Sequence, residues 1–350
     1  MTLIKSISGI RGTIGGAPGD GLSPIDVVRY ASAYGMWLKE QIKNKKATVV
    51  IGRDARISGE MVKNLVVGSL QGLGIDVVDL GLATTPTTEL AVTYYKADGG
   101  IILTASHNPK QWNALKLLNS KGEFLNADHG ARVLEIASNE EFMYASVDDL
   151  GKVKEVTDFL DKHIEEVLSL EMVDVDAIRR ANFKVAIDAV NSVGGIAIPP
   201  LLKVLGVENV LELYCDPTGE FPHNPEPLPE HLGEISKLIV KEKADVGFVV
   251  DPDVDRLAII NEDGSMFGEE YTLVAVADYV LSKFPGNTVS NLSSTRALRD
   301  VTIQRGGKYF AAAVGEVNVV DKMYEVDAVI GGEAMAELSI LPVTVVEMHW

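Results

Sequence analysis

Short continuous apolar runs alternate along the chain with longer stretches of helical spacing. A short run that ends in polar residues is typical of a buried strand, and apolar positions three or four residues apart indicate an amphipathic helix. Their alternation predicts a sheet that is at least partly parallel, with helices as crossovers. In the first part of the chain the predicted strands are 47–54, 75–81 and a run that begins at 99, and the predicted helices are 24–43, 58–73 and 86–95. Ser58 is the expected N-cap of its helix.

The same alternation recurs later in the chain. A charged, mainly helical segment, 126–169, and a proline-rich connector, 217–229, separate the groups of elements. Proline disrupts both helices and strands, so the connector is expected to have no regular structure. The later predicted strands are 244–250, 288–292 and 327–333, and a helix is predicted at 269–284.

These repeated units indicate several similar domains. A chain of 350 residues is long enough for two or three of them. The predicted fold class is α/β, with three consecutive, similar α/β domains and mixed, partly parallel sheets. The expected divisions are 1–153, 154–256 and 257–333, followed by a tail, 334–350.

A polar segment, Thr104-Ala105-Ser106-His107-Asn108-Pro109, follows the run that begins at 99. Pro109 cannot continue a strand, so Ser106 is expected at the carboxyl edge of the sheet, where open α/β folds bind ligands. Lys116 follows ten residues after the serine. The alternative for this segment alone is a polar turn after a core strand.

Three aspartates at alternate positions, Asp251, Asp253 and Asp255, follow the apolar strand 244–250. Crowded carboxylates repel one another, and a hard cation such as Mg²⁺ prefers oxygen ligands. A solvated acidic turn fits poorly, because apolar runs lie on both sides of the loop. An EF-hand also fits poorly, because its glycine and final glutamate are not at the required spacing.

The two motifs together resemble the α-D-phosphohexomutase family, which includes phosphoglucomutase, phosphomannomutase and phosphoglucosamine mutase. The resemblance runs from Ser8 to about Glu333. It implies an isomerase with its active site in the cleft between the domains. The implied reaction moves a phosphoryl group between O1 and O6 of a hexose phosphate through a phosphoserine, with Mg²⁺ as cofactor and a hexose 1,6-bisphosphate as activator and intermediate.

The resemblance also implies roles for individual residues. Ser106 carries the phosphoryl group and completes the Mg²⁺ site of the three aspartates. Lys116 is the general acid and base, and nearby cations are expected to lower its pKa. His107 positions the phosphate or shares the proton transfer. The residues expected to bind the phosphoryl group or the sugar are Arg11 in S-G-I-R-G, Arg256, Thr295, Arg296 and Glu333.

Composition and charge limit the partners. With 46% hydrophobic and 23% charged residues the chain resembles an ordinary soluble enzyme, and no apolar run approaches the roughly 20 residues of a membrane span. The net charge of −18 argues against nucleic acid or an anionic membrane. One cysteine, Cys215, excludes an internal disulfide, and with no signal peptide at the N-terminus a cytoplasmic location is expected.

The resemblance fails immediately after Glu333, where Ala-Met-Ala-Glu stands instead of small polar residues. A one-base shift of the codons for Ala334 to Leu341 can restore Gly-Asn-Gly-Gly-Val-Ile-Tyr-Pro, a sequence found in one branch of the family. We therefore expect the segment 334–350 to result from a frameshift. The family's fourth domain is expected to be absent, which would make this form a poor mutase.

Two alternatives to a mutase stay open. One is a phosphatase-like hydrolase with the same phosphoserine and metal, and the other is a non-catalytic sugar-phosphate binder. Glucose, mannose and glucosamine phosphates are all possible substrates, and the oligomeric state is not indicated.

Overall fold

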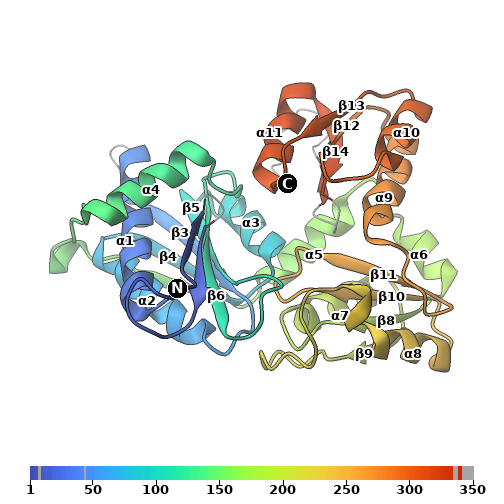
Figure 1. Cartoon of the computed structure of the whole chain (residues 1–350), viewed down its shortest axis with the longest axis horizontal. Helices are drawn as coiled ribbons and strands as arrows, with labels where there is room; N and C mark the ends of the chain where they lie inside the picture. Colours follow the sequence, from blue (N-terminus) through green and yellow to red (C-terminus); the bar gives the residue numbers. More distant parts are fainter. Residues whose placement is uncertain (7–8, 43–44, 334–337, 341–350) are drawn as a thin grey trace.

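The structure, a computed structural model, describes residues 1–6, 9–42, 45–333 and 338–340 of the chain. These residues form three consecutive α/β units, each built on its own sheet. Figure 1 shows the first unit on the left and the second and third on the right, one above the other. The predicted α/β class with mixed, partly parallel sheets is confirmed.

The first unit has a seven-stranded sheet with the order β1-β2-β6-β5-β3-β4-β7. Strands β5, β3, β4 and β7 are parallel, whereas β6 pairs antiparallel with both β5 and β2. The segments that follow β3 and β5 therefore leave the sheet at the same edge. The strands are β1 (Ile4–Ser6), β2 (Gly9–Thr13), β3 (Thr48–Arg53), β4 (Asp76–Leu82), β5 (Gly99–Leu103), β6 (Trp112–Leu118) and β7 (Val153–Glu155).

Helices cover both faces of this sheet. Because side chains alternate along a strand, Val49 and Ile51 of β3 join the core under α1, α2 and α4. Val50 joins the opposite core, which α3 and α5 cover. The helices are α1 (Pro24–Gln41), α2 (Gly59–Gly72), α3 (Thr85–Tyr94), α4 (Ala127–Asn139) and α5 (Phe159–Ser169), with a short 3₁₀ turn η1 (Val147–Asp149).

The second unit has a four-stranded sheet with the order β11-β10-β8-β9. Strand β8 is parallel to β9 and β10, and β11 is antiparallel at the edge. Ile235 and Ile239 attach α8 to one face, and Ile178 of α6 and Leu202 of α7 pack on the other. The elements are α6 (Val175–Ala181), β8 (Lys184–Asp188), α7 (Gly194–Val204), β9 (Asn209–Leu213), η2 (Pro229–His231), α8 (Gly233–Glu242), β10 (Val246–Val250) and β11 (Leu257–Asn261).

The third unit repeats this plan with the strand order β13-β12-β14-β15. Strand β12 is parallel to β13 and β14, and β15 is antiparallel to β14. Ala277 and Leu298 attach α9 and α10 to one face, and Met323 attaches α11 to the other. The elements are α9 (Glu269–Lys283), β12 (Asn287–Asn291), α10 (Ala297–Gln304), β13 (Tyr309–Ala312), α11 (Glu316–Val326), β14 (Ala328–Gly332) and β15 (Leu338–Ile340).

Two strands lie just beyond the domain divisions expected from the sequence. β7 begins at Val153 and pairs with β4, so it extends the first sheet. β11 begins at Leu257 and pairs with β10, so it completes the second sheet. We therefore propose that the first domain extends beyond β7 and that the second extends to the end of β11.

The elements predicted in the first unit are present, with ends that differ by one or two residues. The connector 217–229 has no strand or helix before η2 begins at its last residue, as predicted. Ser58 lies at the N-cap position of α2, as predicted, but its side chain makes no capping hydrogen bond. Its backbone is already helical, and its hydroxyl instead accepts a hydrogen bond from Asn113 Nδ2 at 2.9 Å. Within the described residues, no helix has both the length and the apolar character that crossing a membrane requires.

Candidate active site

Ser106 lies in the loop that leaves the carboxyl end of β5. Thr104 orders this loop, because its hydroxyl donates to Asp54 Oδ2 at 2.7 Å and accepts from the Ser106 backbone N–H at 2.9 Å. Ser106 has a φ of 47°, in the left-handed region, and is 9% exposed. A non-glycine residue adopts this conformation only when its surroundings hold it there, and such strain concentrates at functional sites.

Arg56, which the sequence analysis did not single out, organises the same loop. Its side chain is fully buried, and its Nε donates to Asp54 Oδ2 at 2.9 Å. The Phe221 ring of the second unit lies 5.1 Å from the guanidinium carbon. The guanidinium also donates to the backbone carbonyl oxygens of Ser106, Asn108, Pro109 and Trp112. The buried guanidinium of Arg56 therefore fixes the backbone at four points in the loop between β5 and the start of β6.

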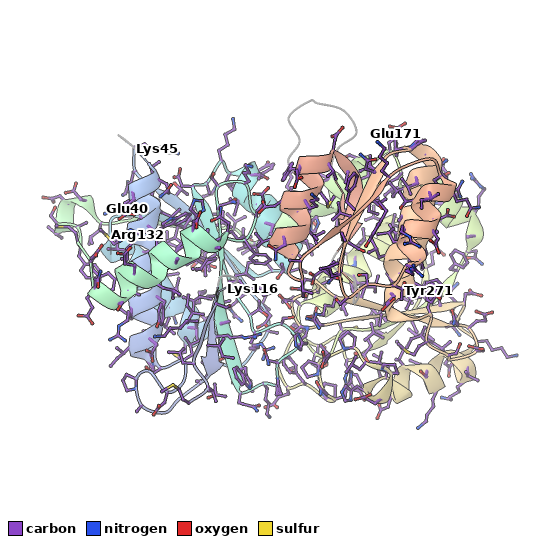
Figure 2. The ribbon with its side chains drawn as sticks, turned by 45° about the horizontal axis from the view of Figure 1, so that its top comes forward. Glu40, Lys45, Lys116, Arg132, Glu171 and Tyr271 are labelled. Carbon is purple, nitrogen blue, oxygen red and sulfur yellow. The ribbon has the colours of Figure 1, made fainter. Side chains whose placement is uncertain are left out.

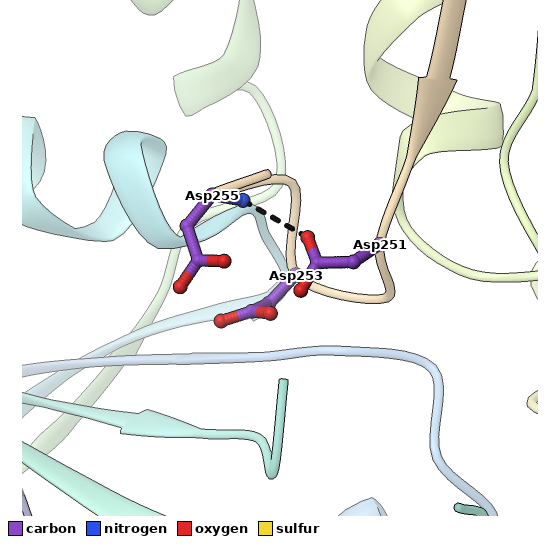
Figure 3. A group of neighbouring side chains, drawn as sticks. All are labelled: Asp251, Asp253 and Asp255. Atoms are coloured by element: carbon purple, nitrogen blue, oxygen red, sulfur yellow. Dashed lines mark hydrogen bonds between the residues drawn. The ribbon is translucent and has the colours of Figure 1, made fainter. Parts of the chain in front are cut away.

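The three aspartates occupy a tight loop after β10, and this loop meets Ser106. Asp251 Oδ2 accepts a hydrogen bond from Ser106 Oγ at 2.8 Å. Its Oδ1 accepts from the backbone N–H groups of Asp255 and Arg256, both at 3.2 Å, and Figure 3 marks the first of these bonds. Val254 has a φ of 62°, so the loop turns sharply between Asp253 and Asp255. The loop thereby gathers all three carboxylates beside the serine.

Lys116 on β6 reaches the same group of side chains from the first unit, and Figure 2 places it near the boundary between the units. Its Nζ lies 2.8 Å from Asp253 Oδ2 and 2.7 Å from Asp255 Oδ2. Burial lowers the pKa of Lys116, but the two carboxylates outweigh burial and raise it well above its ordinary value. The expectation of a lowered pKa is therefore wrong for this arrangement, because the nearest charges are negative.

The three carboxylates fit a divalent cation. One ligand oxygen from each lies within 4.8 Å of the others. Among the described residues, the buried Oδ1 atoms of Asp253 and Asp255 have no hydrogen-bond partner. Burial and the neighbouring aspartates raise the pKa of Asp251 well above its ordinary value. Free buried carboxylate oxygens and unbalanced negative charge are the features that Mg²⁺ binding would satisfy.

His107 lies beside the serine as a neutral imidazole. Its Nδ1 is 3.3 Å from Ser106 Oγ, and its Nε2 is 4.0 Å from Glu226 Oε1. Burial, followed by the positive charges of Arg256 and Arg11, lowers its pKa to about 4. The charges of Arg256 and Arg11 therefore act on His107, and the binding of a phosphoryl group by these two arginines stays a prediction.

The pKa of His107 gives a testable pH dependence. Proton NMR should show its imidazole titrating near pH 4, whereas His223, whose pKa the Asp188 carboxylate raises against the effect of burial, should titrate above its ordinary 6.5. As the pH falls from about 6.5 to 4, unfolded His107 binds a proton that folded His107 does not, so this group lowers stability in that window. His223 has the opposite sign: its contribution is present below 6.5 and is lost as the pH rises through its folded pKa. A His107 signal that titrates near 6.5 would contradict the buried, cation-flanked position.

The predicted sugar-binding residues lie in the third unit. Glu333 follows β14, and its carboxylate accepts a hydrogen bond from the Gly315 backbone N–H before α11. Thr295 and Arg296 follow β12 and are exposed, and the Thr295 backbone N–H donates to Glu270 Oε2 at 2.9 Å. Within the described residues, no hydrogen bond or ion pair joins Glu333, Thr295 or Arg296 to Ser106 or the three aspartates. The structure therefore leaves their roles as predictions.

Glu316, at the start of α11 in the third unit, is influenced by charged residues of the site. Burial and the negative charges of Glu89 and Asp255 raise its pKa well above the ordinary value, and Lys116 partly opposes them. No motif in the sequence assigned a role to this glutamate. Neither Glu316 nor Arg56 belongs to a motif with its own spacing, so only the packing of the units reveals them.

Known proteins similar to this chain belong to one family. Family models for the α/β/α domains I, II and III of phosphoglucomutase/phosphomannomutase match residues 3–144, 161–264 and 268–342. A phosphoglucomutase/phosphomannomutase of Thermococcus kodakarensis is 34% identical over 326 residues, which are 92% of this chain and 70% of that protein. A probable phosphoglucosamine mutase of Methanopyrus kandleri is 31% identical over 93% of this chain and 69% of its own length.

A solved structure is also similar. A phosphoglucomutase/phosphomannomutase family protein of Burkholderia thailandensis superposes with a TM-score of 0.82 and 26% sequence identity, covering 98% of this chain and 74% of that one. The chain belongs to the phosphoglucomutase/phosphomannomutase family, whose members named here are isomerases.

The domain III match extends to residue 342, beyond the point where the resemblance in the sequence analysis ends. In this stretch the structure describes only 338–340, as β15 beside β14. The expected frameshift segment otherwise lies outside the described residues, as does Ser8 at the start of the resemblance.

Proposed function

We propose that this chain transfers a phosphoryl group between O1 and O6 of a hexose phosphate, with Ser106 as the carrier. The observation that supports this most strongly is the meeting of Ser106 Oγ, three carboxylates and Lys116 at the junction of the first two units. A serine beside a cation site, with an ammonium group next to it, has the parts that phosphoryl transfer requires.

Each residue has a specific task in the first half-reaction. Phosphorylated Ser106 donates its phosphoryl group to a hydroxyl of the hexose phosphate, so one P–O bond forms at the sugar as the bond to Oγ breaks. Lys116 carries a proton because its pKa is raised, and it can donate that proton to the departing Oγ. The sugar hydroxyl loses a proton in the same step, which restores the ammonium group. In the second half-reaction the phosphoryl group that the substrate carried from the start passes from its sugar oxygen to Ser106 Oγ. One P–O bond forms at the serine as the bond to the sugar breaks, and the proton moves back from Oγ to that sugar oxygen by way of Lys116.

The cation and the arginines would balance the negative charge of the phosphoryl group. Mg²⁺ held by Asp251, Asp253 and Asp255 would neutralise the phosphoryl oxygens during in-line transfer. Arg11 and Arg256 lie near His107 and supply positive charge beside the serine. His107 is neutral, so its ring N–H can donate a hydrogen bond to an oxygen of the phosphoryl group without adding charge. Local positive charge is needed because the chain itself carries a net charge of −18.

We place sugar recognition in the third unit, with Glu333, Thr295 and Arg296 as the residues that the family resemblance indicates. The curated relatives carry both phosphoglucomutase/phosphomannomutase and phosphoglucosamine mutase names, so the sugar is a hexose phosphate of one of these kinds. A panel of glucose, mannose and glucosamine phosphates identifies it.

A single-turnover assay tests the proposed transfer. The chain is first labelled on Ser106 with radioactive phosphate from a hexose 1,6-bisphosphate and then mixed with hexose 1- or 6-phosphate and Mg²⁺. We expect the label to appear in hexose bisphosphate. Release of the label as inorganic phosphate at the same rate without sugar would instead establish a hydrolase. Retention of the label on the chain, or failure to label it, would establish a non-catalytic binder.

A further inference from the structure

Thr85, which no motif in the sequence singled out, connects the first unit to the aspartate loop of the second. It is the first residue of α3, and its backbone N–H donates to the carbonyl oxygen of Asp253 at 2.8 Å. Its hydroxyl donates to Asp253 Oδ2 at 2.6 Å. Thr85 is 3% exposed and Asp253 is fully buried. Both ends of one aspartate, backbone and side chain, are thus held by one threonine.

The local sequence leaves Thr85 free for this contact. Thr84 serves as the N-cap of α3, because its hydroxyl accepts from the Thr87 backbone N–H at 3.1 Å. The Thr85 N–H is one of the amides at a helix start that have no partner within the helix. Pro86 lacks an N–H and has its φ fixed for the first turn. The N–H and the hydroxyl of Thr85 can therefore both be used outside the helix.

The two carboxylate oxygens of Asp253 differ in their contacts, because both donors bond to the same oxygen. Oδ2 accepts from Thr85 Oγ1 at 2.6 Å and from Lys116 Nζ at 2.8 Å. Oδ1 is buried and has no partner among the described residues. A carboxylate held through one oxygen by two donors cannot rotate without breaking both bonds. The remaining oxygen is then fixed in the position from which it can bind a cation.

We infer that Thr85 is a positioning residue that orients Asp253 toward the divalent cation across the junction of the first and second units. The inference rests on the proposed function, because it requires the cation site of the aspartate loop. A residue bound to a metal ligand in this way fixes the ligand's orientation, and loss of such a partner typically weakens metal binding. Thr85 acts through Asp253 and does not touch the substrate.

The test compares Mg²⁺ binding by variants of the full chain. Thr85→Val and Thr85→Ala both remove the hydroxyl, and the alanine variant guards against a steric effect of valine. Calorimetry should show the Kd for Mg²⁺ rising about tenfold in both, as expected for loss of one hydrogen bond to a charged group. Thr85→Ser keeps the hydroxyl and should restore the affinity. Thr93→Val is the matched control, because the Thr93 hydroxyl bonds within α3, to the Leu90 carbonyl oxygen at 2.9 Å, and to no other group among the residues that the structure describes.

A purely structural role for Thr85 would give a different result. In that case Thr85→Val and Thr85→Ala would lower the melting temperature while the Kd for Mg²⁺ stayed at the wild-type value, and the inference would be overturned. The Mg²⁺ concentration that gives half-maximal phosphoryl transfer should rise together with the Kd. If the wild-type chain binds Mg²⁺ but shows no transfer, the proposed reaction fails while the Thr85 assignment can still be measured. Absence of Mg²⁺ binding by the wild-type chain would overturn both.

Discussion

Asp253→Asn should weaken Mg²⁺ binding by about a hundredfold or more and reduce phosphoryl transfer accordingly. The substitution keeps the size of the side chain but removes one of the three negative charges that a cation would balance. The carboxylate that is lost is ionised at neutral pH. Burial raises the pKa of Asp253, but the Lys116 charge and the Thr85 hydroxyl outweigh burial and lower this pKa to about 2. A group that is always ionised contributes its full charge to cation binding at neutral pH.

Calorimetry with Mg²⁺ and a Mg²⁺ titration of single-turnover transfer measure this effect. Asp263→Asn is the control, because Asp263 is an exposed carboxylate in a turn of the same unit that bonds to the Ser265 backbone N–H at 2.8 Å. It should leave both measurements unchanged. Wild-type affinity in Asp253→Asn would show that the cation binds somewhere other than this loop.

Lys116→Met should make the stability of the chain depend on Mg²⁺. The Lys116 side chain is 17% exposed, and its ammonium group lies between the carboxylates of Asp253 and Asp255, so its removal leaves two buried negative charges without a partner. Breaking a buried ion pair in this way typically costs about 3–5 kcal/mol. A cation bound to the same carboxylates would compensate that charge, so saturating Mg²⁺ should recover much of the loss.

Thermal or denaturant unfolding with and without Mg²⁺ tests this prediction, and phosphoryl transfer should fall about a hundredfold or more even when the variant is fully folded. Lys110→Met is the control, because Lys110 is an exposed lysine whose Nζ lies 2.6 Å from Glu220 Oε2. Exposed ion pairs contribute little, so its stability should change by less than about 1 kcal/mol and should not respond differently to Mg²⁺. Equal responses of the two lysine variants to Mg²⁺ would contradict the arrangement around Lys116.

The elements of the fold could be predicted because hydrophobic periodicity is a local signal. The strand 48–53 and the helices on either side of it have the apolar spacing that burial demands. The role of Ser58 could not be predicted, because its hydroxyl bonds to Asn113, 55 positions away in the sequence. Strand β7 could not be predicted from the sequence either. Its three residues are exposed and form no apolar run, so they become a strand only by pairing with β4.

The residues of the site also fall into two groups, those that a sequence motif indicates and those that only the structure reveals. Ser106, Lys116 and the three aspartates stand in motifs whose residue types and spacing indicate chemistry, and the structure brings all five together. Arg56 and Thr85 act through backbone carbonyls and a carboxylate that lie far away in the sequence, so no spacing indicates them. The raised pKa of Lys116 could not be predicted from the sequence either, because it depends on which charges are nearest in space.

The central claim is that Ser106 carries the phosphoryl group, and intact mass spectrometry tests it most directly. The chain is incubated with a hexose 1,6-bisphosphate and Mg²⁺, freed of ligand and compared with the Ser106→Ala variant treated in the same way. The account predicts that the wild-type chain gains the mass of one phosphate and that the variant gains none. A wild-type chain that gains no phosphate, or a Ser106→Ala variant that gains one, would contradict the account.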